Sequence, residues 1–260
     1  MNANETESTH GRALSIEVVH QPQEWRPLAE QVSVTCQQVL PGVIGVYVHG
    51  SAAMGGMTDR SDLDVLVVTA DAAGVDQLGG ALLALPNQDR PLELSVVTAE
   101  AAYTPAAPWP FLVHVNSSAG EVVLDEGAGD ADLVAHYVVT RARGGTILGP
   151  PPATVLGAIS RVQFVSYLVS ELEWGLRCAD QKYAVLNACR AVGFASTGHL
   201  LSKVEGAQWW IQNRGASPLV AECLLAQQSC HDLGPCTDVA RRFVAECSAE
   251  LRRSVGLDRS

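Results

Sequence analysis

The chain has 260 residues, with 28 acidic against 17 basic side chains and a net charge of −11. Hydrophobic residues make up 47% of the sequence and charged residues 17%, a composition typical of a globular protein with a sizeable core. The acidic surface repels phosphate backbones and attracts polycations, so we expect no nucleic-acid partner.

We expect no targeting signal at the start of the chain. Residues 1–12 (MNANETESTHGR) are polar, have no apolar core of a signal peptide, and are expected to be disordered. No apolar run approaches the roughly 18 residues of a membrane span. The seven cysteines form no CxxC pair, which argues against a zinc ribbon or a disulfide framework. We therefore expect a cytoplasmic monomer with no membrane partner.

The first part of the chain alternates helical patterns with short β-branched runs typical of buried strands. The segment between the first two runs is too short for a full crossover helix, so these strands are antiparallel or, through one short helical turn, parallel. The predicted elements are a helix over Glu24–Leu40, strands over Val43–His49 and Leu63–Thr69, a helix over Val75–Leu85, and a strand over Leu92–Thr98.

The middle of the chain contains the predicted domain boundary. Three prolines predict an irregular surface segment over Tyr103–Gly120, and a helix follows over Asp130–Arg143. Glycines and prolines in 144–152 then interrupt the chain, and after residue 155 apolar residues recur at helical spacing with no strand pattern. The expected fold is an α/β (α+β) domain with a mixed sheet over residues 13–150, followed by an all-α helical bundle over residues 151–260.

The segment from Gly50 to Asp64 contains the candidate metal-binding residues. Gly50 and Ser51 follow the first strand, and Ser61, Asp62 and Asp64 lead into the next. Side chains two apart on a strand point to the same face, so the two aspartates present adjacent carboxylates. Adjacent carboxylates repel each other unless a cation or proton joins them. Magnesium commonly combines one or two carboxylates with substrate phosphates, which makes Asp62 and Asp64 candidate metal ligands.

The residues around the two aspartates suit a triphosphate. Gly50 lets the backbone approach a phosphate, and the amides of Gly50 and Ser51 can cradle the outer phosphates. The hydroxyls of Ser51 and Ser61 can donate further hydrogen bonds. A plain glycine-rich turn capped by aspartate is the alternative reading of the same residues.

The segment from His49 to Asp64 resembles the signature of the polymerase-β-like nucleotidyltransferases. More narrowly, residues 40–220 resemble the aminoglycoside adenylyltransferases that modify streptomycin and spectinomycin. The further matching stretches are DADLVAHYVVTRARGGTILGP, from Asp130 to Pro150, and NACRAVGFASTGHLLSKVEGAQWW, from Asn187 to Trp210. The resemblance implies transfer of AMP from ATP to an antibiotic hydroxyl with Mg²⁺ as cofactor.

The resemblance also implies roles for three further residues. A carboxylate on the next strand deprotonates the acceptor hydroxyl in related enzymes, and Glu93 occupies that place. Burying an unpaired charge in an apolar strand is costly, and a role as the base would explain why a glutamate stands at position 93. The alternatives are an exposed edge-strand glutamate paired with Arg90, or Glu100 as the base. The resemblance assigns Arg190 and Lys203 to binding of the triphosphate, which places the active site between the two domains. The alternative is that both are surface cations.

One departure from the family bears on the acceptor. Streptomycin-modifying members carry a tryptophan in the central segment, whereas residues 114–118 here read HVNSS. We therefore expect spectinomycin to be favoured over streptomycin. Trp174 and Asp180 are candidate substrate-binding residues, with Asp180 aligned to an acidic residue that faces the antibiotic. Trp174 is otherwise an aromatic on an amphipathic helix.

Two other functions remain open on the sequence. The enzyme could act on a different small molecule, or on a protein side chain in a toxin–antitoxin pair. A non-catalytic nucleotide-binding module is the third hypothesis, although such a protein has no use for a base at Glu93. Pyrophosphate release with a panel of acceptors would distinguish them.

Overall fold

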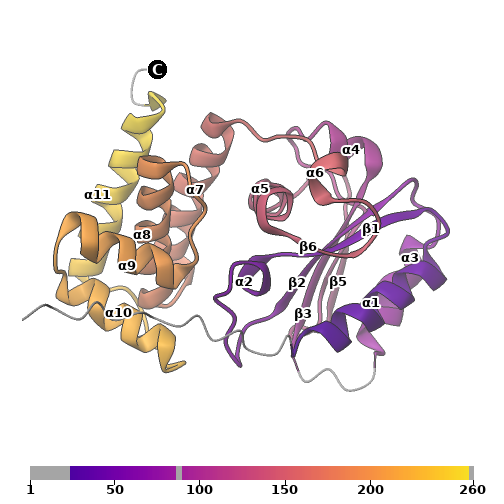
Figure 1. Ribbon diagram of the computed structural model, residues 1–260, viewed down its shortest axis with the longest axis horizontal. Coiled ribbons are helices and arrows are strands. Elements are labelled where there is room, and N and C mark those ends of the chain that lie inside the picture. Colours follow the sequence, from indigo (N-terminus) through magenta and orange to yellow (C-terminus); the bar gives the residue numbers. More distant parts are fainter. Residues whose placement is uncertain (1–23, 86–89, 258–260) are drawn as a thin grey trace, which may run out of the picture.

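The computed structural model describes residues 24–85 and 90–257, in two parts that lie side by side (Figure 1). A six-stranded sheet with helices on both faces forms the first part, and a bundle of helices forms the second. The fold class predicted from the sequence is confirmed. The expectation for residues 1–12 lies outside the described residues, as does the predicted start of the first domain at residue 13.

The sheet is mixed, with the strand order β5-β4-β3-β2-β1-β6. Its β2–β3 pair is parallel, and every other neighbouring pair is antiparallel. The antiparallel alternative for the first two strands is therefore the correct one. The strands are β1 (Val43–Val48), β2 (Leu63–Thr69), β3 (Leu92–Thr98), β4 (Val113–Asn116), β5 (Glu121–Leu124) and β6 (Gly145–Leu148).

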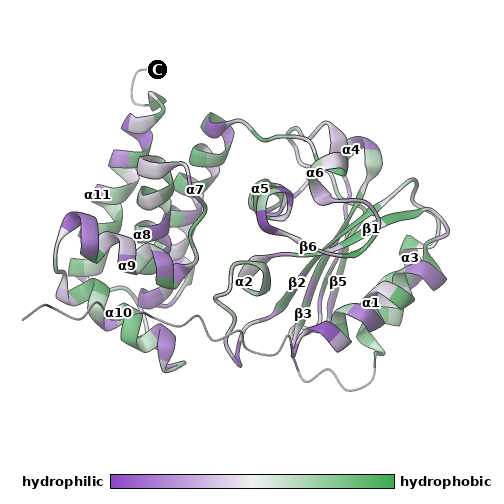
Figure 2. Cartoon of the chain, viewed as in Figure 1, coloured by the Kyte–Doolittle hydropathy of each residue, from purple (hydrophilic) through white to green (hydrophobic). Residues whose placement is uncertain are grey.

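The two faces of the sheet bury different sets of side chains. One face packs against α1 and α3, and Leu63, Val65 and Val67 of β2 point to it. The opposite face carries Leu66 and Val68 and packs against residues of α4 and α5. In Figure 2 the central strands are largely hydrophobic, whereas the surrounding helices are mixed. The helices of this part are α1 (Arg26–Val39), α2 (Gly50–Ala53), α3 (Val75–Leu83), α4 (Ala99–Tyr103), α5 (Leu133–Arg143) and α6 (Pro152–Val155).

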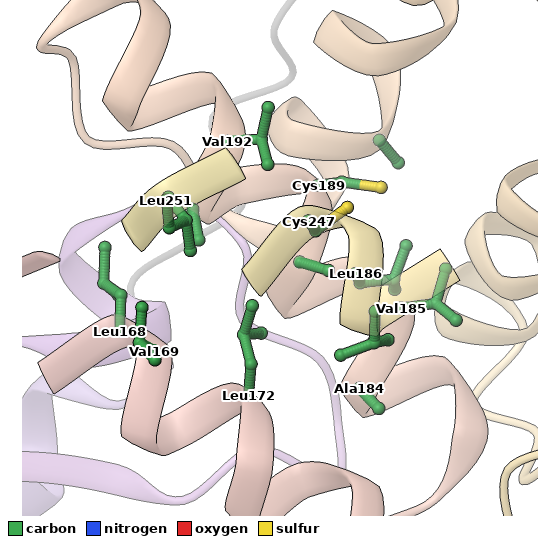
Figure 3. Packing of buried hydrophobic residues seen from close by; sticks show 14 of the residues in the cluster. Leu168, Val169, Leu172, Ala184, Val185, Leu186, Cys189, Val192, Cys247 and Leu251 are labelled. Carbon is green, nitrogen blue, oxygen red and sulfur yellow. The ribbon is translucent and has the colours of Figure 1, made fainter. Parts of the chain in front are cut away.

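The core of the helical part is drawn mainly from α7, α8, α10 and α11, and Ala207 of α9 and Val134 of α5 also belong to it. Figure 3 shows Leu168 and Leu172 of α7, Cys189 of α8, and Cys247 and Leu251 of α11 packing together. Residues 156–257, all described, contain helices and no strand, as the periodicity predicts. The helices are α7 (Arg161–Cys178), α8 (Gln181–Thr197), α9 (Lys203–Arg214), α10 (Pro218–Gln228) and α11 (Asp238–Ser254).

Two sequence interpretations were wrong. The predicted irregular segment Tyr103–Gly120 contains β4, which pairs with β3 as an interior strand of the sheet. The predicted chain break around residue 145 contains β6, which pairs with β1. Both strands have only four residues and lie close to prolines or glycines, so no run long enough to show a β pattern remains.

Two features bear on the domain boundary that the sequence predicts between residues 150 and 151. Leu156 is buried in the sheet cluster, and α6 packs against α4 and α5. Ser160 then caps α7 through a capping box, in which its hydroxyl accepts from the backbone N–H of Gln163. We therefore propose a boundary within residues 157–160 rather than between 150 and 151.

Candidate active site

The predicted carboxylates meet on one face of the sheet. Asp64 on β2 lies directly opposite Glu93 on the parallel neighbour β3, and Glu93 lies opposite Asn116 on β4. All three lie on the face that α5 covers, because their positions alternate with those that pack against α1 and α3. Asp62 lies just before β2. The structure therefore brings Asp62, Asp64 and Glu93 into one wall of a single cavity.

Glu93 is not an exposed edge-strand residue paired with Arg90. Its strand lies between β2 and β4 in the sheet. The Arg90 guanidinium donates instead to two loop carbonyls, that of Thr58 at 2.9 Å and that of Ser61 at 2.7 Å. Glu100, the other candidate base, lies on α4 with an exposed side chain and is not among the residues that line the cavity.

Gly50 is required by Asp64 itself. It has φ +57°, and a Cβ atom built on it would overlap the Asp64 carboxylate. The turn at Gly50 is tied to β2 because the His49 amide donates to the Asp64 carbonyl at 2.9 Å. The sequence analysis attributed this glycine to phosphate approach alone, whereas the structure shows that the carboxylate occupies the space of its missing side chain.

The two serines differ in what they can offer a ligand. The Ser51 amide donates to the Asp64 carboxylate, while the Ser51 hydroxyl is buried without a hydrogen-bond partner in a residue that lines the cavity. The Ser61 hydroxyl accepts from the Thr58 amide at 2.9 Å and lies 3.0 Å from the Thr58 hydroxyl. Ser51 is therefore the serine with an unused hydroxyl, and Ser61 orders the loop that carries Asp62.

Burial raises the pKa values of all three acids, and repulsion by neighbouring carboxylates adds to the shift at Asp64 and Glu93. Burial, then the charges of Glu93 and Asp62, raise the pKa of Asp64 to about 7, although the Ser51 amide opposes the shift. Burial also raises the pKa of Asp62, against the opposing charge of Arg90. The pKa of Glu93 is raised by burial first, with His114 opposing and nearby aspartates adding to the shift. A cation near these groups would relieve this repulsion.

The donor set fits magnesium held jointly with a substrate. Within residues 24–85 and 90–257 no three His, Cys, Asp or Glu side chains form a complete protein ligand set. Two carboxylates beside an open cavity leave coordination positions for phosphate oxygens and water, which is how Mg²⁺ is commonly bound. Asp62 and Asp64 are the residues that would hold it.

The helical part supplies positive charge to the opposite wall. Arg190 on α8 and Lys203, the first residue of α9, both line the cavity. Gly206, one turn along α9, packs so closely against the Arg190 backbone that any side chain there would clash with it. This close packing of α8 and α9 brings the two cations together. The charge of Asp64 acts on Lys203 strongly enough to influence its pKa.

The cavity has a volume of about 990 Å³ and lies between the sheet and the helices. This is at the upper end of the roughly 300–1,000 Å³ of small-molecule sites. It collects nine of the ten residues singled out from the sequence, namely Gly50, Ser51, Ser61, Asp62, Asp64, Glu93, Trp174, Arg190 and Lys203.

Asp180 is the residue that the structure does not bring to the cavity wall. It caps α8, where one carboxylate oxygen accepts from the Lys182 amide at 2.9 Å. The other oxygen accepts from the Gly234 amide at 2.5 Å. With both oxygens engaged by backbone, Asp180 has a structural explanation that needs no substrate.

Sequence reasoning missed several cavity residues that helix geometry could have found. Tyr167, Glu171 and Trp174 follow at four- and three-residue steps on α7, and all line the cavity. Tyr183 lies two turns before Arg190 on α8 and shares its face. Once Trp174 and Arg190 are placed at the site, their neighbours at helical spacing are the next candidates. Asp132 of the α5 N-terminus lines the cavity too.

No described helix has the length and apolar character needed to cross a membrane.

Two family models match the chain in succession. A nucleotidyltransferase domain matches residues 29–102, and the C-terminal domain of aminoglycoside adenylyltransferases matches residues 154–232.

Curated relatives match across both parts of the chain. Spectinomycin 9-adenylyltransferase from Staphylococcus aureus is 26% identical over 191 residues, covering 65% of this chain and 71% of that protein. Aminoglycoside (3'') (9) adenylyltransferase from Klebsiella pneumoniae is 24% identical over 256 residues, covering 88% and 95% respectively.

A solved structure has a similar fold. It is spectinomycin adenyltransferase AAD(9) from Enterococcus faecialis with ATP and spectinomycin, which superposes with a TM-score of 0.63 at 19% identity. The match covers 87% of this chain and 98% of that one, so the sheet and the helices correspond as a single arrangement.

Proposed function

Because the chain belongs to the aminoglycoside adenylyltransferase family, we propose that it transfers AMP from ATP to a hydroxyl of an aminoglycoside or aminocyclitol antibiotic. The observation that carries this proposal is the pairing of Asp64 with Glu93 on adjacent strands, opposite Arg190 and Lys203 across one cavity. One wall thus suits a reacting hydroxyl and a metal, and the other suits a triphosphate.

The chain's own residues supply binding, orientation and proton transfer. Arg190 and Lys203 hold the phosphates and stabilise the charge on departing pyrophosphate. The unpartnered Ser51 hydroxyl donates to a phosphate oxygen. Glu93 accepts the proton of the attacking hydroxyl, and its raised pKa brings its basicity closer to that task. Mg²⁺, bound by Asp62 and Asp64, would neutralise triphosphate charge and polarise the α-phosphoryl group.

The acceptor side of the cavity is acidic. Glu93, Asp132 and Glu171 line it, and the repulsion of these carboxylates contributes to the raised pKa values of Glu93 and Asp132. No described Lys or Arg forms an ion pair with any of these three. A cationic acceptor would supply the missing positive charge.

Spectinomycin is the acceptor that we favour over streptomycin. The central segment lacks the tryptophan of streptomycin-modifying members, and Asp180, aligned with an acidic antibiotic-facing residue, is committed to a helix cap. The relative from Staphylococcus aureus is named for spectinomycin. Streptomycin resistance without spectinomycin resistance in cells carrying the gene would contradict this choice. We further propose that the protein acts as a cytoplasmic monomer.

Pyrophosphate release tests the function directly. The purified protein, ATP and Mg²⁺ are incubated with spectinomycin, streptomycin and other aminoglycosides, and the adenylylated product is identified by mass. We expect release only with an acceptor present, greatest with spectinomycin. Asp64→Asn, which keeps the shape of the side chain, should abolish release. Acceptor-independent release, or full activity of Asp64→Asn, would rule out the proposed chemistry.

A further inference from the structure

Three effects disfavour the positive charge of Lys203. Burial and then the neighbouring charge of Arg190 lower the pKa of its ammonium to about 8, although the charges of Asp64 and Glu171 act in the opposite direction. It is also the first residue of α9, where the helix dipole is positive and disfavours a cation. Among the described residues no carboxylate forms an ion pair with it. A cation in this position needs a partner to hold it.

That partner is the ring of Tyr183. The Lys203 ammonium lies 4.3 Å from the centroid of this ring, well inside the roughly 6 Å reach of a cation–π contact. Both residues line the cavity, and they come from different helices, α8 and α9. The contact therefore fixes the ammonium relative to a side chain outside its own helix.

The Tyr183 ring is itself held at its edge and at its hydroxyl. The Tyr183 hydroxyl donates to Glu171 Oε1 at 2.5 Å, and Trp174 meets the ring edge to face at 5.8 Å. Both contacts come from α7. The ring therefore presents a constant face to Lys203, while its hydroxyl is occupied away from the ammonium.

We propose that Tyr183 is a positioning residue, whose ring face holds the Lys203 ammonium at the triphosphate end of the cavity. Glu171 fixes the ring through the Tyr183 hydroxyl. The inference rests on the proposed function, because it gives Lys203 its phosphate ligand. It adds a residue on α8 that touches neither the triphosphate nor the acceptor and acts only through Lys203.

The test measures ATP affinity by calorimetry in the presence of Mg²⁺ and without acceptor. Tyr183→Leu removes the ring and should weaken ATP binding about 10- to 30-fold, the size of a desolvated cation–π contact. Tyr183→Phe keeps the ring and should stay within about 3-fold of the wild type. Equal losses in both variants, or no loss in Tyr183→Leu, would overturn the proposal.

A double-mutant cycle isolates the pair. Lys203→Met removes the charge, and in that background Tyr183→Leu should weaken ATP binding no further, because the ring then has no cation to hold. Tyr167→Leu is the matched control, since it deletes another cavity-lining tyrosine, one that donates to Asp132 at 3.1 Å and faces no lysine. Its ATP affinity should equal that of the wild type. Additive losses in the cycle would contradict a positioning role.

A second measurement covers the case in which Tyr183→Leu does not fold. Phenylalanine carrying one, two or three fluorines at position 183 keeps the shape of the ring while weakening its negative face. ATP affinity should fall stepwise along this series, whereas a purely structural role predicts no trend. Failure of the wild type itself to bind ATP would overturn the proposed function as well, whereas a flat series with normal wild-type binding overturns only the role of Tyr183.

Discussion

At Asp64, burial and repulsion both raise the pKa of the carboxyl, and they are opposed by one backbone amide and by the charge of Lys203. The folded protein therefore keeps a proton on this carboxyl up to about pH 7, whereas the unfolded chain releases it near the ordinary value of 3.8. Between these two values the stability of the metal-free protein falls as the pH rises, because the native state binds the extra proton. Without a cation, the charged carboxylates of this site therefore lower the stability of the folded protein.

Asp64→Asn should accordingly stabilise the protein without metal. At pH 8 in a chelator, we expect the melting temperature of the variant to exceed that of the wild type by roughly 5 °C or more. The difference should shrink toward pH 4, where the wild-type carboxyl is protonated and resembles the amide. Calorimetry at several pH values measures this. A variant less stable than the wild type at pH 8 would show that the carboxylate is compensated in a way the geometry does not reveal.

Glu93→Gln separates the base from the metal ligands. The amide keeps the volume but cannot accept a proton, so the transfer rate should fall by roughly 10²- to 10⁴-fold with ATP affinity near that of the wild type. The acid limb of the pH–rate profile should also disappear. Glu100→Gln, exposed on α4, is the matched control and should leave the rate unchanged. Restoration of Glu93→Gln by excess Mg²⁺ would reassign the residue as a metal ligand.

Local geometry alone groups the two aspartates in the sequence, whereas the base and the two cations of the site came from the family resemblance. Asp62 and Asp64 are two apart beside a strand, so their common face follows from the backbone period alone. Asp180 illustrates the opposite case, since only the tertiary contact with Gly234 shows that both its oxygens are engaged. Tyr183 and Lys203 are twenty positions apart on two helices, and no pattern in the chain predicts that they touch.

The turn of α2 is the element on which the metal site depends. Gly50 and Gly55 both have positive φ, +57° and +69°, but only at Gly50 would a Cβ atom meet another group, the Asp64 carboxylate. Substitution of Gly55 therefore measures only the free energy lost by placing a side chain in the left-handed region. Substitution of Gly50 measures that loss together with the overlap with the Asp64 carboxylate.

Gly55→Ala should cost about 1–2 kcal/mol of unfolding free energy, the penalty of an alanine in the left-handed region. Gly50→Ala should cost distinctly more and should also abolish Mg²⁺-dependent ATP binding, because Asp64 must move to make room. Urea unfolding measures the first effect and calorimetric titration the second. Equal costs in the two variants, with ATP binding intact in both, would mean that the carboxylate relocates freely.

Strand length explains which elements the sequence predicted. The structure places β2 and β3 at the predicted residues, because each is an uninterrupted run of seven residues in the centre of the sheet. The three strands that were not predicted, β4, β5 and β6, have four residues each. Their place in the sheet comes from pairing with longer neighbours, and such pairing leaves no periodic signal in so short a segment.

Across the whole molecule, the cavity joins two parts that few ion pairs connect. Asp232, between α10 and α11, contacts one residue of the sheet part and one residue of the helical part. Its carboxylate lies 2.7 Å from Lys182 Nζ on α8 and 3.6 Å from Arg60 Nη1 in the loop before β2. Both cations line the cavity, so Asp232 neutralises positive charge at the edge of the proposed triphosphate site.

Asp232→Asn should release these two cations toward the nucleotide. We expect ATP affinity to rise by about 2- to 5-fold at low ionic strength, because an exposed ion pair contributes little. Salt should remove the gain, since Asp232 and Arg60 are both about two-thirds exposed and their charges are screened. For the same reason the melting temperature should change by less than about 3 °C.

Glu250→Gln is the matched control, because it breaks an ion pair with Arg214 on the helical part, away from the cavity lining. Its ATP affinity should equal that of the wild type at every salt concentration. Asp232 is exposed, and Lys182 keeps the His231 carbonyl as a hydrogen-bond acceptor in the variant, so a large fall in melting temperature would point to separation of the two parts. Weaker ATP binding together with such a fall would show that Asp232 holds the sheet and the helices in register, and that its role is closure of the cavity rather than restraint of its cations.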